Sequence, residues 1–159
     1  MGKNIKEISS GFTLVELMIV VALLGIVLAI AVPSINSTLD EMKLDSAAQE
    51  IVTATHYVQS LAIKEGLVYE VKFSDGANKF SCRQGGTIIN PLDKKDYEVD
   101  FDTEGHLQGV DIISASFFAG KLTFDSLGEA SESGTVLLDY SGLQKTITVS
   151  APIGRVTVQ

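Results

Sequence analysis

The residues of this chain whose types suit chemistry are few and scattered. The 159 residues include one cysteine, Cys82, and two histidines, His56 and His106, so an internal disulfide and a cysteine-built zinc site are excluded. Cys82 and His106 would form a nucleophile and base pair, but a lone cysteine within a strand is more often a small packed residue. The G-x-S-x-G, Walker A and H-E-x-x-H motifs are absent. We therefore expect no catalytic residue, no cofactor and no enzymatic activity.

A second candidate is an acidic run. Asp100, Asp102 and Glu104-Gly105, followed by Asp111, approach the spacing of an EF-hand calcium loop. The run departs from that pattern at its fifth position, which is Glu rather than Asp or Asn, and at its last, which is Asp rather than Glu. Because the flanks alternate as strands do, we predict a β-hairpin that turns at Glu104-Gly105, and no metal site. Weak calcium binding between Asp100 and Asp111 stays an alternative.

The third candidate is Glu16, a carboxylate at the edge of a long apolar segment. Residues 17–39 carry no charge, and residues 12–32 would span ~30 Å as a helix, the hydrocarbon thickness of a bilayer. We therefore predict a single membrane span over 12–32. The short flank 1–11 is positive and should stay in the cytoplasm, so that the C-terminal domain lies outside it. An ionisable group in such a helix is costly and usually functional.

The most specific motif is GFTLVE at residues 11–16, followed at once by the apolar segment. It closely resembles the processing site of type IV pilins and type II secretion pseudopilins, where a prepilin peptidase cuts after the glycine and N-methylates the new terminal residue. The resemblance implies cleavage between Gly11 and Phe12, and methylation of Phe12. It also implies that Glu16 of an incoming subunit pairs with the Phe12 amine of a subunit already in the filament. That pairing agrees with the need of a buried carboxylate for a cationic partner.

Two other interpretations of this segment stay open. Ala29-Ile30-Ala31 has the small-x-small form of a signal peptidase site, which would release a secreted soluble β-domain that starts at Val32 and binds a ligand. Against it, the apolar run is long for a signal peptide and Glu16 lies inside its edge. A plain uncleaved anchor leaves Glu16 unexplained.

Beyond Pro33 the pattern stays helical and becomes amphipathic. Small and apolar residues recur every three or four positions opposite a polar row, and Gly66 is a plausible C-terminal stop. We predict a long helix that ends at Glu65, within a helical region of residues 12–66. The apolar face comprises Leu44, Ala47, Ala48, Ile51, Ala54, Thr55, Val58, Leu61 and Ala62, and the polar row comprises Asp45, Gln49, Thr53, His56, Ser60 and Lys64.

After Gly66 the period changes from 3.6 to 2, which indicates strands. Residues 67–73 and 79–83 read as a hairpin, and further β-rich runs occur at 97–103, 106–113, 121–124, 135–140, 145–150 and 155–158. We expect about eight short strands in a globular β domain over 67–159. The fold class is α+β, with a long N-terminal helix packed on an antiparallel β-sheet or a small β-sandwich.

The C-terminal part resembles the GspH/FimT-type minor pseudopilins. The matching elements are Leu122-Thr123-Phe124-Asp125 with Gly128, Gly134-Thr135-Val136, Thr148-Val149-Ser150 and Gly154-Arg155-Val156. The resemblance implies a low-abundance structural subunit near the tip of a type II secretion pseudopilus or type IV pilus-like filament. A minor pilin of a DNA-uptake pilus would look much the same.

Charge and family resemblance together indicate the partners. A net charge of −8 has the wrong sign for broad contact with nucleic acid. The resemblance implies other pilin or pseudopilin subunits, a prepilin peptidase and the inner membrane as partners. The expected location is the inner (cytoplasmic) membrane, with the C-terminal domain in the periplasm or at the cell exterior.

Overall fold

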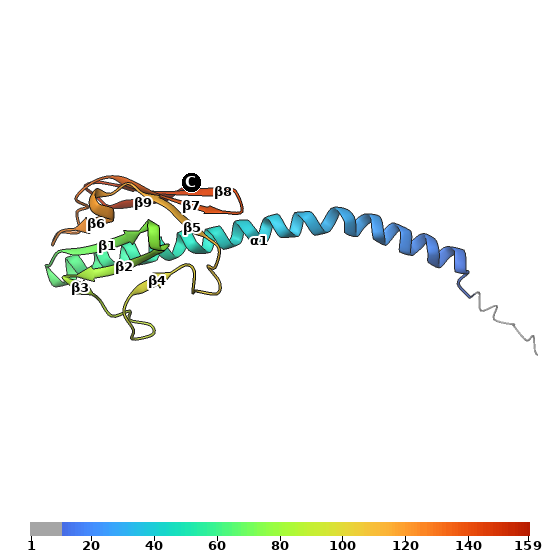
Figure 1. Cartoon of the computed structure of the whole chain (residues 1–159), viewed down its shortest axis with the longest axis horizontal. Helices are drawn as coiled ribbons and strands as arrows, with labels where there is room; N and C mark the ends of the chain where they lie inside the picture. Colours follow the sequence, from blue (N-terminus) through green and yellow to red (C-terminus); the bar gives the residue numbers. More distant parts are fainter. Residues whose placement is uncertain (1–10) are drawn as a thin grey trace, which may run out of the picture. The chain divides into compact units, whose positions relative to one another are not determined.

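The computed structural model of the chain describes residues 11–159, apart from the side chains of residues 30–37 and of Asp75. The chain divides into two units, Met1–Thr38 and Leu39–Gln159. One helix, α1 (Leu14–Glu65), contributes to both (Figure 1). Apart from Gly11, the leader that we predict over residues 1–11 lies outside the described residues.

In the first unit, α1 exposes its apolar side chains. Phe12 is 83% exposed, and the large apolar residues from Leu14 to Leu28 are all exposed. A helix that is apolar on all sides is stable only where lipid or other helices cover it. Within the described residues, no helix combines the length and apolar character required to cross a membrane. The last three residues of the span that we predict over 12–32, residues 30–32, belong to the segment whose side chains lie outside the described part.

In the second unit, α1 buries the face that the sequence predicts. Its buried residues are Leu44, Ala47, Ala48, Ile51, Ala54, Thr55, Val58 and Ala62, while the polar row is exposed. Four of the buried residues are alanines, which allow the strands to approach the helix closely. The helix ends as expected: Gly66 takes φ +66° and its N–H donates to the Ala62 carbonyl at 3.0 Å.

The second unit contains two antiparallel sheets, so the α+β prediction is confirmed. The first sheet has the order β3-β2-β1-β6, with β4 also paired to β2, and the second has the order β5-β7-β8-β9. Two 3₁₀ turns, η1 (Asp75–Ala77) and η2 (Phe118–Gly120), connect strands. The strands are β1 (Tyr69–Ser74), β2 (Lys79–Gln84), β3 (Gly86–Thr87), β4 (Glu98–Asp100), β5 (Asp111–Ala115), β6 (Lys121–Phe124), β7 (Gly134–Tyr140), β8 (Leu143–Ser150) and β9 (Arg155–Val158).

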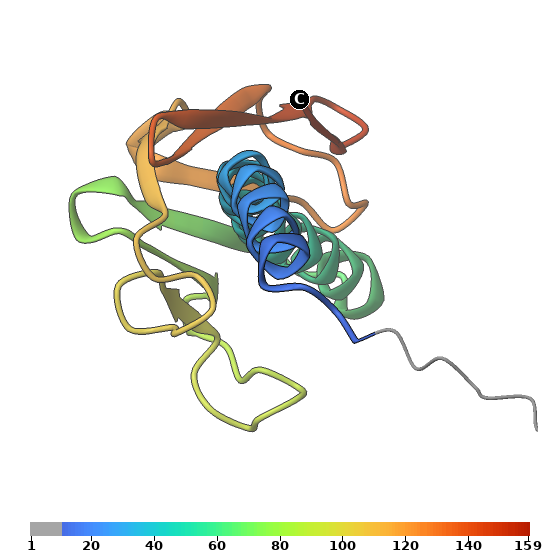
Figure 2. The ribbon, with the colours of Figure 1, turned by 90° about the vertical axis from the view of Figure 1, so that its right-hand side faces the viewer.

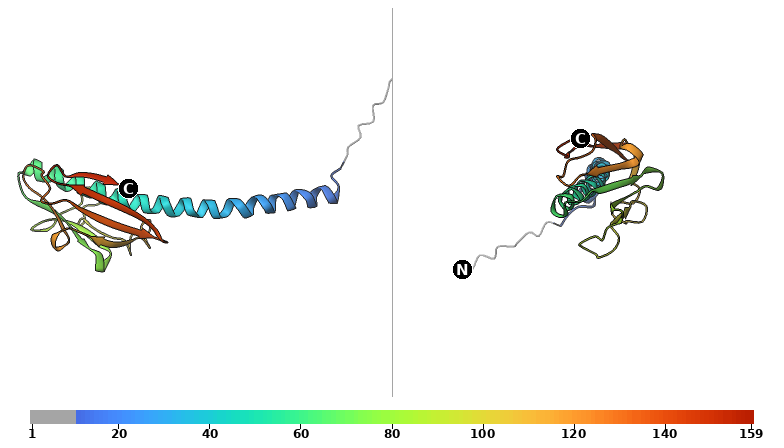
Figure 3. Two further views of the ribbon diagram at one scale, coloured as in Figure 1. Left: turned by 90° about the horizontal axis from the view of Figure 1, so that it is seen from above. Right: turned by 90° about the vertical axis from the view of Figure 1, so that its left-hand side faces the viewer.

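A single hydrophobic core joins the helix to both sheets. Viewed along α1, its C-terminal half lies on the inner side of the β7–β9 strands and of β1 and β2 (Figure 2), and two further views agree (Figure 3). Four phenylalanines fill much of the core: Phe73 stacks on Phe117 with ring centroids 5.7 Å apart, and Phe80 meets Phe101 edge-on at 6.1 Å. All the buried apolar residues of the described chain lie in this second unit.

The predicted hairpin that turns at Glu104-Gly105 is wrong. Strand β4 pairs with β2 through Phe80↔Val99, and β5 pairs with β7 in the other sheet through Ile112↔Leu138. The connection between β4 and β5 is a series of turns rather than two strand arms. Phe101, Leu107 and Val110 in this connection are fully buried, so it lies against the core instead of extending outward as a hairpin.

Candidate functional site

The peptide between Gly11 and Phe12 lies immediately before α1. Residues 11–13 are non-helical and exposed, and the helix begins at Leu14. Apart from its chain neighbours, no heavy atom of the described residues lies within 4 Å of a Cβ built on Gly11. A peptidase requires an accessible, non-helical peptide bond, and the bond after Gly11 meets both conditions in the described residues.

Glu16 is held by Thr13 in a reciprocal cap at the start of α1. The Thr13 backbone N–H and its hydroxyl both donate to Glu16 Oε2 at 2.9 Å, and the Glu16 N–H donates to Thr13 Oγ1 at 3.2 Å. This is a capping box, in which Ser or Thr and a Glu three residues later each satisfy a free backbone N–H of the other. The negative side chain also lies at the positive end of the helix dipole.

The sequence analysis missed this cap, although the signal is present in the chain. Thr13-x-x-Glu16 has the S/T-x-x-E form and directly precedes an apolar run. Glu16 therefore has a local role in a single subunit that is separate from any pairing between subunits. The carboxylate has hydrogen-bonded partners within its own helix turn before a second chain is present.

Cys82 and His106, which we considered as a nucleophile and base pair, differ in exposure, since Cys82 is buried and His106 is exposed. Cys82, in β2, is fully buried, and burial raises the pKa of its thiol to about 12. The thiol is therefore protonated at neutral pH and is not a nucleophile. His106 is exposed in the turns after β4, and His56 is exposed on the polar row of α1.

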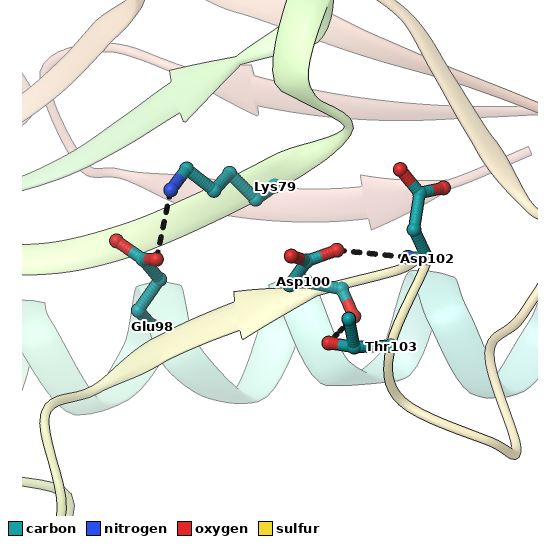
Figure 4. Close-up of polar contacts among 5 residues, drawn as sticks. All are labelled: Lys79, Glu98, Asp100, Asp102 and Thr103. Atoms are coloured by element: carbon teal, nitrogen blue, oxygen red, sulfur yellow. Dashed lines mark hydrogen bonds and ion pairs between the residues drawn. The ribbon is translucent and has the colours of Figure 1, made fainter.

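Carboxylates in and beside the acidic run already accept hydrogen bonds from side-chain and backbone donors. Glu98 pairs with Lys79 at 2.9 Å, and Asp100 accepts the Asp102 N–H at 2.9 Å, so their carboxylates do not converge on one point (Figure 4). The Thr103 hydroxyl donates to the Asp100 carbonyl at 3.3 Å, which tightens the same turn.

The side-chain amide of Asn78 donates to two carboxylates of this run, those of Asp102 and Asp111. Its Nδ2 donates to Asp102 Oδ1 at 2.8 Å, to the Val110 carbonyl at 2.9 Å and, more weakly, to Asp111 Oδ1 at 3.4 Å. Its Oδ1 accepts the Ile112 N–H at 2.8 Å. Among the described residues no three His, Cys, Asp or Glu side chains are grouped so that they would hold a metal ion. This geometry gives the EF-hand interpretation no support.

Two family models together match most of the chain. The prokaryotic N-terminal methylation motif matches residues 8–32, which include Gly11, Phe12 and Glu16. The model of the type II transport protein GspH matches residues 47–152, which cover most of the second unit. The chain belongs to the GspH family.

Solved structures similar to this GspH-family chain confirm the pilin fold. The minor pseudopilin EpsH of the type 2 secretion system of Vibrio cholerae is 16% identical, with a TM-score of 0.58 over 74% of this chain and 96% of that chain. The type IV minor pilin FimU of Pseudomonas aeruginosa is 20% identical, with a TM-score of 0.55 over 75% of this chain and 90% of that chain. At these identities the similarity shows the fold alone.

Family membership establishes the general function. The chain is a structural, non-enzymatic minor pseudopilin of the type II secretion family, with a prepilin-type N-terminus. The family assembles with other pseudopilins, is processed by a prepilin peptidase and is anchored in the inner membrane. The predicted family is thus confirmed, whereas the individual residues Gly11, Phe12 and Glu16 stay predictions.

Proposed function

We propose that a prepilin peptidase cuts this chain between Gly11 and Phe12 and methylates the Phe12 amine. Residues 12–32 anchor the mature subunit in the inner membrane in a single pass, and the β domain over 67–159 lies outside the cytoplasm. The subunit then takes a low-abundance place near the tip of a pseudopilus or type IV pilus-like filament. The observation that carries this proposal is the exposed, non-helical Gly11–Phe12 peptide directly before the Thr13–Glu16 cap.

Glu16 has two successive roles in this proposal. In the single subunit its carboxylate is satisfied by Thr13, which lowers the cost of placing a charge at the edge of an apolar helix. Cleavage then creates a cationic amine at Phe12. In the filament, Glu16 of the incoming subunit pairs with the Phe12 amine of the subunit already placed, because opposite charges attract strongly away from water. This pairing fixes the axial register.

The mass of the mature protein tests the processing step. Intact-mass analysis of membrane-extracted protein is expected to give a chain that begins at Phe12 and carries one added methyl group. Gly11→Val is the matched control and should leave the leader attached. A chain that begins at Val32 would instead show cleavage after Ala31 and a secreted soluble β-domain, and would overturn the proposal.

Three substitutions separate the cap from the charge pair. Glu16→Gln keeps a capping box, because Gln serves as well as Glu at that position, but removes the charge. Thr13→Ala keeps the charge and removes the cap. If the charge pair sets the register, Glu16→Gln and Glu16→Val should reduce incorporation into filaments roughly a hundredfold or more, because loss of one partner of a buried ion pair costs about 3–5 kcal/mol. Thr13→Ala should reduce it only about fivefold, because loss of an N-terminal cap costs about 1 kcal/mol.

Membrane insertion and cleavage provide the controls for these variants. Cleavage after Gly11 should continue in both Glu16 variants. Membrane insertion should be unchanged in Glu16→Gln and unchanged or improved in Glu16→Val, which makes the span more apolar. Normal co-purification of Glu16→Gln with its filament partners would refute the pairing role. A loss in Thr13→Ala as large as that in Glu16→Gln would instead assign the defect to the helix start.

A further inference from the structure

The outward side of strands β1, β2 and β6 in the first sheet carries four lysine and arginine side chains. In β1, β2 and β6 the inward residues are buried and the alternate residues point outward, as the pleat requires. The outward set includes Lys72, Lys79, Arg83 and Lys121, which we call the basic face. These are four of the 12 lysine and arginine residues in a chain whose net charge is −8.

Two lysines of the basic face lie directly opposite each other. Lys72 of β1 and Lys121 of β6 are partners in the antiparallel register. Like charges at such positions destabilise a sheet. On its other side Lys72 lies opposite Ser81, which offers no charge. Within the described residues no ion pair of Lys72 is found. The repulsion is therefore only partly offset.

One carboxylate serves two cations of this face. Glu70 Oε2 lies 3.1 Å from Lys121 Nζ, and Glu70 Oε1 lies 3.6 Å from Arg83 Nε. The second distance is too long for a hydrogen bond, and Arg83 Nε is a buried donor without a hydrogen-bond partner. Over the whole face the four cations stand against Glu70 and, from β4, Glu98 and Asp100, which leaves an excess of one positive charge. Around Lys72, three cations, Lys72, Arg83 and Lys121, stand against Glu70 alone, which leaves a local excess of two positive charges on a half-buried surface.

We propose that the basic face is a docking surface for a carboxylate-bearing surface of another subunit of the filament. The inference rests on the proposed function, since it requires that the chain assembles. A partner carboxylate placed between Lys72 and Lys121 would offset their repulsion. It would also compete with Glu70 for Lys121, so that Glu70 could shorten its 3.6 Å ion pair with Arg83 Nε to a hydrogen bond. Charge complementarity therefore favours a partner that brings one or two acidic side chains.

The same face is poorly suited to other anionic partners. Its aromatic neighbours Tyr69, Phe73, Phe80 and Phe124 are buried on the inner side, so no described aromatic side chain of these strands is available to stack on bases. Four cations are also fewer than the six to ten phosphate contacts of a typical DNA complex, and the carboxylates of Glu70, Glu98 and Asp100 lie among them. We therefore do not expect this face to bind nucleic acid or anionic lipid, and the test below includes both.

The test measures binding and thermal stability of the same variants. Purified full-length chain in detergent is titrated with the purified pilin-type subunits encoded beside it, at two salt concentrations. Lys72→Ala and Lys121→Ala should each weaken binding about three- to tenfold and reduce its salt dependence. Lys72→Arg should bind as the wild type does. Lys95→Ala, which removes the same charge from an exposed loop, is the control and should leave binding unchanged.

Stability separates docking from a structural role. If Lys72 serves the partner, Lys72→Ala should leave the Tm of the free chain unchanged or raise it by about 1–3 °C, because a like-charge contact is removed. A fall in Tm together with the loss of binding would overturn the proposal, as would wild-type binding by Lys72→Ala. Lysine-dependent binding to a DNA duplex or to phosphatidylglycerol vesicles, but not to pilin-type subunits, would show that the proposed partner is wrong.

The outcome also distinguishes this inference from the proposed function. If the wild type is cut after Gly11 and joins filaments, and the lysine variants do so equally well, only the docking surface is refuted. If the wild type binds no pilin-type subunit and is not cut after Gly11, the proposed function fails, and the docking surface fails with it.

Discussion

Asn78 offers the most direct test of how the second unit is held together. It is 9% exposed, it has a positive φ of 48°, and it links the turn after β1 to the segment that leads into β5. Replacement by alanine would remove three hydrogen bonds of 2.9 Å or less, made with Asp102, Val110 and Ile112. It would also leave the Val110 carbonyl and the Ile112 N–H without that partner.

The expected magnitude follows from these contacts. Each hydrogen bond contributes about 0.5–1.5 kcal/mol net, and a buried group left without a partner costs about 1–3 kcal/mol. Alanine at a left-handed position adds about 1 kcal/mol of strain. We therefore expect Asn78→Ala to lower the free energy of unfolding by about 3–5 kcal/mol. Asn78→Gly relieves the strain but not the lost contacts, so it should be about 1 kcal/mol less harmful.

The variant Asn78→Asp tests how a negative charge at this position affects stability. The introduced carboxylate would keep an acceptor for the Ile112 N–H but would face Asp102 and Asp111. Neighbouring carboxylates raise the pKa of such a group above its unfolded value of about 4. The free energy of unfolding of Asn78→Asp should therefore fall as pH rises above about 4. Relative to Asn78→Ala, the Asp variant should be more stable near pH 4 than it is at pH 7.

Urea unfolding followed by tyrosine fluorescence is a suitable assay. The chain has four tyrosines and no tryptophan, and all four lie between Tyr57 and Tyr140, so the signal reports the second unit alone. An Asn78→Ala variant within about 1 kcal/mol of the wild type would refute the argument that these hydrogen bonds are strongly stabilising. Equal pH dependence of the Ala and Asp variants would refute the carboxylate repulsion.

Three further predictions concern the same unit. A chain that begins at Asp40 should be soluble, folded and mainly monomeric by circular dichroism and gel filtration, because the described core lies wholly after that residue. An unfolded product in several buffers would count against this prediction. Gly134→Ala should lower the free energy of unfolding by about 1–3 kcal/mol, because its Cβ would lie 2.4 Å from the buried Phe117 ring, whereas Gly86→Ala, with open space around it, should not. Burial raises the pKa of the Cys82 thiol to about 12, so the free energy of unfolding should fall as pH rises from about 9 towards 12, and should fall less steeply in Cys82→Ala. At neutral pH the native thiol should resist alkylation until urea unfolds the chain.

Local features of the sequence determined the helix and its functional start. The small-residue stripe of α1, its end at Gly66 and the GFTLVE motif each depend on residues a few positions apart, so spacing alone predicts them. The cap between Thr13 and Glu16 is equally local and was readable from the same six residues. Most strand positions followed from the period of two, which indicates the face that each residue takes in a sheet. The runs predicted at 97–103 and 106–113 were wrong in their extent, because residues 101–110 form turns between β4 and β5.

The choice of strand partners was decided only by the tertiary structure. Alternation gives β4 and β5 an inner and an outer face, but it does not specify that β4 pairs with β2 and β5 with β7. That choice depends on burying Phe101 and Leu107 between the two strands against a core made of distant residues. The same holds for Lys72 and Lys121, which are 49 positions apart in the chain and become neighbours only because β1 and β6 pair. Strand pairing is a non-local balance of burial and hydrogen bonding, so the basic face had no signature in the sequence.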